Sequence, residues 1–191
     1  VLDPTVVADV KVRYREIRQR QRESAGGVAL AVTEVLALDV SAEDRERTYE
    51  AGWQQGGLYH VLTSYADIMM DPTANDTAAE FVRTKIRSTV TDPAVAEILC
   101  AKDYPIGTKR ICIDTNYFET YNRDNVRLVD LRATPLTAIT AAGVTTTAEE
   151  FEFDSLVFAT GFDAMTGTLV AVDIQGRDGM TLKDAWSAGP R

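Results

Sequence analysis

The first hundred residues carry amphipathic stretches separated by short turn signals, a pattern that predicts consecutive helices. Asp3 and Pro4 mark a helix start, because Asp can cap the first turn and Pro fits its geometry. Apolar side chains then recur every three or four residues from Val7 to Ile17, which places them on one face. The Gly-Gly pair at 26–27 is expected to end this helix.

The same signals predict further helices over 41–56, 59–70, 76–90 and 92–100. Residues 28–40 are apolar but have no clear period, so an irregular or partly extended connection is expected there. Several helices joined by short turns make a small helical subdomain. We place this subdomain at residues 1–102.

After residue 102, short strand patterns replace the helical spacing. They predict strands at 111–113, 125–130 and 150–159, a hairpin of 136–140 with 144–147, and a short helix or turn at 117–122. The last strand passes from alternation into a continuous apolar run, as in a strand entering a covered sheet. The chain is therefore predicted to be mixed α/β, with a second part over residues 103–191.

The run 155–167 ends its apolar part at Gly161, where a residue without Cβ can turn sharply or approach a ligand closely. Ligands of open α/β sheets bind beyond the carboxyl ends of the strands. Ala159, Thr160 and Gly161 therefore occupy the position that a cofactor would contact. An ordinary strand–turn junction that binds nothing is an equally open interpretation.

Composition narrows the function classes. The chain has 191 residues, 45% hydrophobic and 26% charged, which is ordinary for a soluble globular protein. Its net charge of −9 argues against a general nucleic-acid surface, and no apolar run is long enough to span a bilayer. We expect no signal peptide, a cytoplasmic location, and free thiols at Cys100 and Cys112, whose spacing fits neither a zinc finger nor a secreted framework.

Adjacent cations at Lys109 and Arg110 follow a Pro-Ile-Gly-Thr loop and suit an anion such as a phosphate. Solvated surface charge is the alternative, and the residues alone leave it open. His60 is the only histidine and is expected to be a packed or half-exposed residue, with no predicted metal site. Trp53 and Trp186 are expected to be core or interface anchors.

Three ordered segments resemble the Baeyer–Villiger branch of the class B flavoprotein monooxygenases, typified by cyclohexanone and phenylacetone monooxygenases. They are Val157-Phe-Ala-Thr-Gly-Phe-Asp-Ala164, the pair 103–110 and 114–126, and the pair 173–179 and 182–186. The resemblance covers most of the chain and is strongest over about residues 100–190. It implies that residues 103–191 hold the C-terminal part of a Rossmann-like NADP-binding domain and the hinge that returns to an FAD-binding domain, both incomplete.

The resemblance also implies an activity and roles for particular residues. The family uses FAD and NADPH to insert one oxygen atom of O2 into a ketone, which gives an ester or lactone. Lys109 would contact the 2′-phosphate of NADP, and Arg110 would lie at the flavin–nicotinamide junction and stabilise the anion that attacks the ketone. The backbone of Ala159, Thr160 and Gly161 would lie near the nicotinamide cofactor.

The sequence also departs from the family pattern. No Gly-x-Gly-x-x-Gly occurs, although the family carries one such motif for FAD and one for NADP, and the family's Phe, Gly, His and Trp-Pro pattern is missing too. We therefore expect an internal fragment that is inactive alone and binds cofactor poorly. An exposed sheet edge invites self-association, so a dimer or aggregation-prone species and a monomer are equally open expectations. The alternatives are an N- or S-oxygenating class B monooxygenase and a non-enzymatic helical interaction module.

Overall fold

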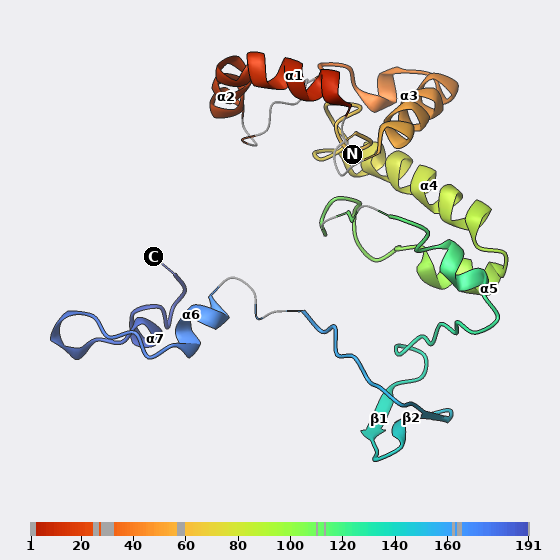
Figure 1. Ribbon diagram of the computed structural model, residues 1–191, viewed down its shortest axis with the longest axis vertical. Helices are drawn as coiled ribbons and strands as arrows, with labels where there is room; N and C mark the ends of the chain where they lie inside the picture. The colour runs from red at the N-terminus through yellow and green to blue at the C-terminus, as the bar shows by residue number, and fades with distance from the viewer. Residues whose placement is uncertain are drawn as a thin grey trace. The chain divides into compact units, whose positions relative to one another are not determined.

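The computed structural model describes residues 3–24, 27, 33–56, 60–109, 111–112, 114–161, 163 and 166–190. The chain divides into two compact units, Val1–Val129 and Asp130–Arg191 (Figure 1). The first unit is helical and the second contains a small sheet, so the predicted mixed α/β class is confirmed. The boundary predicted after residue 102 separates a helical subdomain from part of a nucleotide-binding domain. The division into compact units does not test that assignment, so the boundary stays a prediction.

The first predicted helix is present as two segments, α1 (Pro4–Val12) and α2 (Tyr14–Glu23). The Asp3 side chain caps α1 by accepting a hydrogen bond from the Thr5 N–H at 2.7 Å. The helical hydrogen bonds continue across the junction, because the Arg13 N–H donates to the Asp9 carbonyl and the Arg13 carbonyl accepts from Ile17. No residue of either segment is buried.

Three further helices begin at side-chain caps. They are α3 (Ala42–Gln55), α4 (Pro72–Thr89) and α5 (Pro93–Leu99), preceded by the short 3-10 helix η1 (Ala37–Asp39). The starts of α3 and α5 agree with the predictions, but the helix predicted over 76–90 begins four residues earlier, because Asp71 caps it instead of ending a preceding helix. The hydroxyl of Ser41 accepts from the Asp44 N–H, and the carboxylates of Asp71 and Asp92 accept from the first N–H groups of α4 and α5. Side-chain acceptors of this kind satisfy the otherwise unpaired donors of a helix start.

The predicted helix over 59–70 is wrong for residues 60–70, which form successive turns and bends; residues 57–59 lie outside the described residues. Four apolar side chains of this segment are buried: Val61, Leu62, Tyr65 and Ile68. Their spacing of one to three residues fits an amphipathic helix and a chain of turns equally well. Tertiary hydrogen bonds decide between the two, because the Ala66 N–H donates to the Val35 carbonyl at 2.9 Å and the Ala37 N–H to the Asp67 carboxylate at 2.8 Å.

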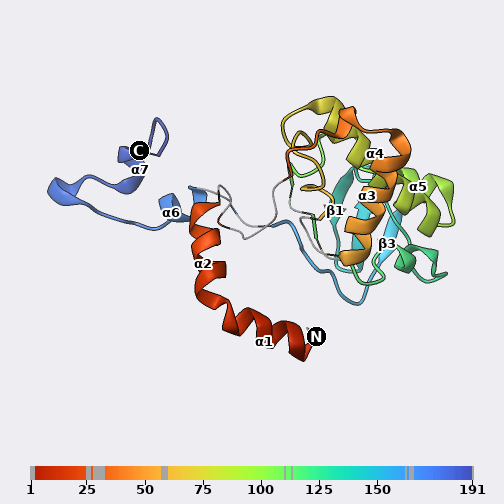
Figure 2. The ribbon, with the colours of Figure 1, turned by 90° about the horizontal axis from the view of Figure 1, so that it is seen from above.

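The core of the first unit lies between α3, α4 and the 60–70 segment (Figure 2). The Tyr49 ring meets Tyr65 edge-on at 5.7 Å between centroids and lies 5.5 Å from Phe81. The Tyr49 hydroxyl also shares a hydrogen bond of 2.7 Å with the Thr77 hydroxyl. A second cluster joins the end of α4 to α5, and its buried members are Ile86, Val90, Ala96 and Cys100.

Between the helices and the second unit, the chain is mostly irregular. The short 3-10 helix η2 (Glu119–Asn122) agrees with the predicted helix or turn at 117–122. The predicted strands at 111–113 and 125–130 are wrong for the described residues, which have no strand pairing there. Residue 113 lies outside the described part of the chain.

The second unit contains one antiparallel sheet of β1 (Leu136–Ile139), β2 (Gly143–Thr146) and β3 (Glu150–Glu152), in that order. The predicted hairpin is therefore confirmed. A Cβ at Gly143 would lie 2.0 Å from the Phe151 carbonyl oxygen, so the approach of β2 to β3 requires glycine. The predicted strand over 150–159 is correct only as far as Glu152, because no described residue pairs with 153–159 as a strand.

The chain ends in α6 (Gly167–Ala171), the 3-10 helix η3 (Arg177–Gly179) and α7 (Leu182–Ala185). Thr181 caps α7, since its hydroxyl accepts from the Asp184 N–H at 3.1 Å. Among the described residues, no helix has both the length and the apolar character needed to cross a membrane.

Candidate functional site

A tight turn presents Lys109. The Thr108 N–H donates to the Pro105 carbonyl at 3.2 Å, and Gly107 has φ +89°, the pattern of a type II turn with glycine at its third position. A Cβ at Gly107 would lie 2.9 Å from the Met69 sulfur and 3.3 Å from a Leu62 methyl carbon. The turn therefore packs closely on the 60–70 segment, which fixes the direction in which the chain leaves it.

The Lys109 side chain is exposed, and its ammonium lies 4.9 Å from the centroid of the Tyr104 ring. It borders a hollow of about 180 Å³ whose apolar floor includes Ala79, Val82 and Ile86 of α4. No carboxylate among the described residues pairs with this ammonium. Lys109 is thus a compact positive charge that remains available to an anion such as a phosphate.

Arg110 lies outside the described residues, so its expected contact with the flavin–nicotinamide junction stays a prediction. Ala159, Thr160 and Gly161 are exposed, and Gly161 has φ +85° with no atom within 4 Å of a Cβ placed there. This φ is one that favours glycine, but Gly161 lies in neither a turn nor a bend, so its approach to a ligand stays a prediction. Lys109 belongs to the first unit and Gly161 to the second, so their sharing of one site also stays a prediction.

The other singled-out side chains have ordinary surroundings. His60 is half-buried, as predicted, and the described residues contain no group of three or more His, Cys, Asp or Glu side chains that could hold a metal ion. Both cysteines are reduced thiols outside any disulfide, as expected, with Cys100 buried and Cys112 exposed. Burial raises the pKa of the Cys100 thiol. Trp53 packs edge-on against Phe81 at 5.9 Å.

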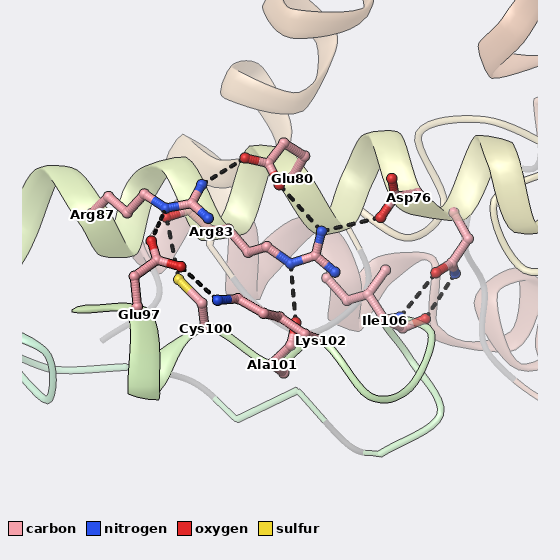
Figure 3. A network of polar contacts seen from close by, with 10 residues as sticks. Asp76, Glu80, Arg83, Arg87, Glu97, Cys100, Ala101, Lys102 and Ile106 are labelled. Carbon is pink, nitrogen blue, oxygen red and sulfur yellow. Dashed lines mark hydrogen bonds and ion pairs between the residues drawn. The ribbon is translucent and has the colours of Figure 1, made fainter. Parts of the chain in front are cut away.

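The sequence prediction missed a polar network that joins α4 to α5 and to the segment beyond it (Figure 3). The Arg87 guanidinium pairs with Glu80 and with Glu97, and Lys102 also pairs with Glu97, each at 2.6 Å. The hydrogen bonds from Arg87 and Lys102 lower the pKa of Glu97 to about 2. The sequence spacing could have predicted part of this network. Residues three and four positions apart share one helix face, and this holds for Glu80, Arg83 and Arg87.

A second missed feature is the amide of Asn75, which is buried on α4 with 6% of its surface exposed. Its Nδ2 donates to the carbonyls of Ile68 and Ile106, and its Oδ1 accepts from the Ile106 N–H, each at 2.9 Å. The side chain thereby bonds both main-chain groups of Ile106. Nothing near Asn75 in the sequence identifies this partner, which lies 31 residues away.

Comparisons with known proteins agree with one another. A Baeyer–Villiger monooxygenase from Pseudooceanicola batsensis is 40% identical over 190 residues, which is 98% of this chain and 34% of that protein. A cyclohexanone 1,2-monooxygenase from Acinetobacter is 40% identical over 186 residues, or 96% of this chain and 34% of that protein. A solved structure described as an oxidized steroid monooxygenase bound to NADP matches 100% of this chain and 36% of its own, with 49% identity and a TM-score of 0.89. No protein-family model matches the chain.

The identity and the fold show that the chain is homologous to one segment of FAD-binding monooxygenases. Within that class it is a homologue of the Baeyer–Villiger monooxygenases, so the resemblance inferred from the three sequence segments is confirmed. The chain spans about a third of the length of the curated relatives it matches, in agreement with the expected fragment of a longer enzyme.

Proposed function

We propose that the protein containing this chain is a Baeyer–Villiger monooxygenase that uses FAD, NADPH and O2 to convert a ketone into an ester or lactone. The observation that carries this proposal is the 49% identity, over the whole chain, to a steroid monooxygenase whose structure was solved with NADP. Because the chain spans about a third of its relatives, it contributes only part of the cofactor sites.

In this proposal, bound FAD and NADPH supply the oxygen activation and the reducing equivalents, and the chain's residues bind and orient them. The Lys109 ammonium binds the 2′-phosphate of NADPH. Its exposure and its freedom from carboxylate partners among the described residues support this role. Arg110 supplies a fixed positive charge beside the reacting flavin, where a buried anion needs one. The backbone of 159–161 borders the nicotinamide.

The activity is tested with the purified full-length protein. We expect flavin absorbance, NADPH oxidation that depends on an added ketone, and an ester or lactone that carries one oxygen atom from 18O2. Amines and sulfides are tested in parallel as alternative substrates under the same conditions. Oxidation of these compounds with no turnover of any ketone would refute the Baeyer–Villiger assignment in favour of an N- or S-oxygenating enzyme.

The role of Lys109 is tested by Lys109→Ala, with Lys109→Arg as the charge-conserving control. Loss of one charge-assisted contact of about 1.5–3 kcal/mol corresponds to a rise of tenfold or more in KM for NADPH. The KM for NADH should stay within about twofold, because NADH has no 2′-phosphate to lose. An equal effect on both coenzymes would contradict the proposal.

The role of Arg110 separates the two half-reactions. We expect Arg110→Ala to retain reduction of the flavin by NADPH and to lose ester formation, because the charge acts on the oxygen-transfer step. Stopped-flow absorbance measures the first half-reaction and product analysis the second. Full ester formation by Arg110→Ala would remove this residue from the chemistry.

The isolated 191-residue chain is expected to bind FAD poorly, because its sequence lacks the glycine-rich motifs that hold each pyrophosphate. Gel filtration after mixing with FAD measures this directly. Stoichiometric co-elution of flavin with the chain would show that the segment holds the cofactor alone.

A further inference from the structure

The segment between α5 and Lys109 is anchored to α4 at two points. We propose that Asn75 and Arg83 are positioning residues that hold the Lys109 turn in place and thereby set the preference for NADPH over NADH. The inference rests on the proposed contact of Lys109 with the 2′-phosphate. It assigns to the helical unit a part in coenzyme selection, beyond the lysine itself.

Asn75 forms the first anchor. Its amide makes three hydrogen bonds of 2.9 Å, and two of them bond the N–H and the carbonyl of Ile106. The third bond, to the Ile68 carbonyl, links the same side chain to the segment on which the turn packs. An amide offers donors and an acceptor at one point, which an apolar side chain of equal size cannot replace.

Arg83 forms the second anchor and lies eight residues after Asn75 on α4 (Figure 3). Only 15% of its side chain is exposed, and its Nε donates to the Ala101 carbonyl at 3.0 Å. Ion pairs of 3.1 Å to Asp76 and 3.2 Å to Glu80 hold the guanidinium from the other side. The guanidinium is thus oriented before it bonds the loop, which lowers the entropic cost of holding that carbonyl.

Lys109 lies close along the chain to both anchored residues, Ala101 and Ile106. It follows Ile106 by three residues, and the intervening turn is closed by the Thr108 bond to Pro105. Its ammonium lies over Tyr104, which is itself between the anchored residues Ala101 and Ile106. A shift of Ile106 would therefore be transmitted to the ammonium through a turn with few free dihedral angles.

A purely structural role makes a different prediction. If Asn75 and Arg83 only stabilise the fold, their loss lowers the amount of active enzyme and affects both coenzymes equally. If they position Lys109, the loss falls on NADPH, since the lysine contacts only the extra phosphate. The ratio of kcat/KM for NADPH to that for NADH separates the two.

The test uses the full-length enzyme with Asn75→Leu, Arg83→Met and Lys109→Ala. We expect each anchor variant to lower kcat/KM for NADPH by roughly tenfold, equivalent to about 1.4 kcal/mol, and to change the value for NADH by less than about twofold. The double variant Asn75→Leu/Lys109→Ala should have the same preference as Lys109→Ala alone. Arg83→Met keeps the test available if Asn75→Leu does not fold.

Tyr49→Phe is the matched control. It removes the hydrogen bond of 2.7 Å between Tyr49 and Thr77 of α4, so it costs stability in the same unit without touching the 101–109 segment. We expect an unchanged coenzyme ratio. Hydrogen exchange of the peptide containing Ile106 should speed up in Asn75→Leu and not in Tyr49→Phe, because only the first loses the acceptor of that amide.

The outcomes distinguish the two proposals. If Lys109→Ala does not lower the preference for NADPH, the proposed role of Lys109 fails and this inference fails with it. If Lys109→Ala lowers the preference but both anchor variants reduce NADPH and NADH use equally, only the inference about Asn75 and Arg83 is overturned. If the preference for NADPH over NADH falls in all three variants, the proposed role of Lys109 and the inference about Asn75 and Arg83 are both supported.

Discussion

The turn that presents Lys109 should not accept a side chain at Gly107. Alanine at φ +89° costs about 1–2 kcal/mol, because an L-residue is strained in this region. The new Cβ would also lie 2.9 Å from the Met69 sulfur and 3.3 Å from a Leu62 methyl carbon. Overpacking of this kind adds about 1 kcal/mol, so Gly107→Ala should lower the free energy of unfolding by roughly 2–3 kcal/mol.

Urea unfolding followed by Trp53 fluorescence measures this loss, because Trp53 packs on Phe81 in the core of the same unit. Trp186 belongs to the other unit, so the measurement is made in a Trp186→Phe background. Gly56→Ala is the control for strain alone. Gly56 has φ +70° with nothing within 4 Å of an added Cβ.

The contact itself is isolated by a double-mutant cycle. Met69 is 55% exposed and can be shortened at small cost, whereas Leu62 is 8% exposed and cannot move far. The loss of unfolding free energy in the double variant Met69→Ala/Gly107→Ala should be about 1 kcal/mol smaller than the sum of the losses in the two single variants. A Gly107→Ala variant as stable as the parent, or a cycle with no coupling, would refute this account of the turn.

Three further predictions concern the helical unit. Phe81 is 3% exposed, so Phe81→Ala should lower the free energy of unfolding by about 3 kcal/mol, whereas Phe81→Leu should cost about a third of that in the same urea assay. Glu97 has its pKa lowered from 4.5 to about 2, so its contribution to stability is present above pH 4.5 and is lost as the pH falls toward 2. Glu97→Gln should make the free energy of unfolding fall less steeply between pH 4.5 and pH 2. An unchanged fall would contradict the ion pairs of Glu97 with Arg87 and Lys102. In a thiol-reagent assay, exposed Cys112 should react at once and buried Cys100 only on unfolding; equal rates would argue against the burial of Cys100.

The helix starts at Ser41 and Asp92 could be predicted, whereas the start at Asp71 was wrongly placed at 76 although its contacts are equally local. Ser41 and Asp92 bond the N–H groups two or three positions ahead, so the sequence around them contains both partners. The same holds for the β1–β2 hairpin, whose strands are joined by three residues. Local chemistry was sufficient in these places.

Prediction failed where distant partners decide the conformation. The 60–70 segment has helical spacing of its apolar residues, yet hydrogen bonds to Val35 and Ala37 hold it as turns. The run 153–159 has the composition of a buried strand, but strand structure requires a pairing partner that no described residue provides. The alternation of 125–130 failed for the same reason.

In the candidate site, too, the features that depend on neighbouring residues could be predicted and those that depend on distant partners could not. The Pro-Ile-Gly-Thr turn and its neighbouring cation could be found from five adjacent residues. The anchor at Asn75 could not, because an asparagine inside a helix pattern gives no indication that its amide bonds Ile106, 31 residues away. The charged face of α4 was available from its spacing alone, but its link to the Ala101 carbonyl was not.

The division between Val129 and Asp130 has a practical consequence for engineering. Chimeras that exchange segments between related monooxygenases lose least when the crossover separates two groups of residues that each pack among themselves. A crossover at this bond would transfer the Lys109 turn together with α4 and both of its anchors. A crossover between residues 83 and 101 would instead combine the lysine of one parent with the supporting helix of another.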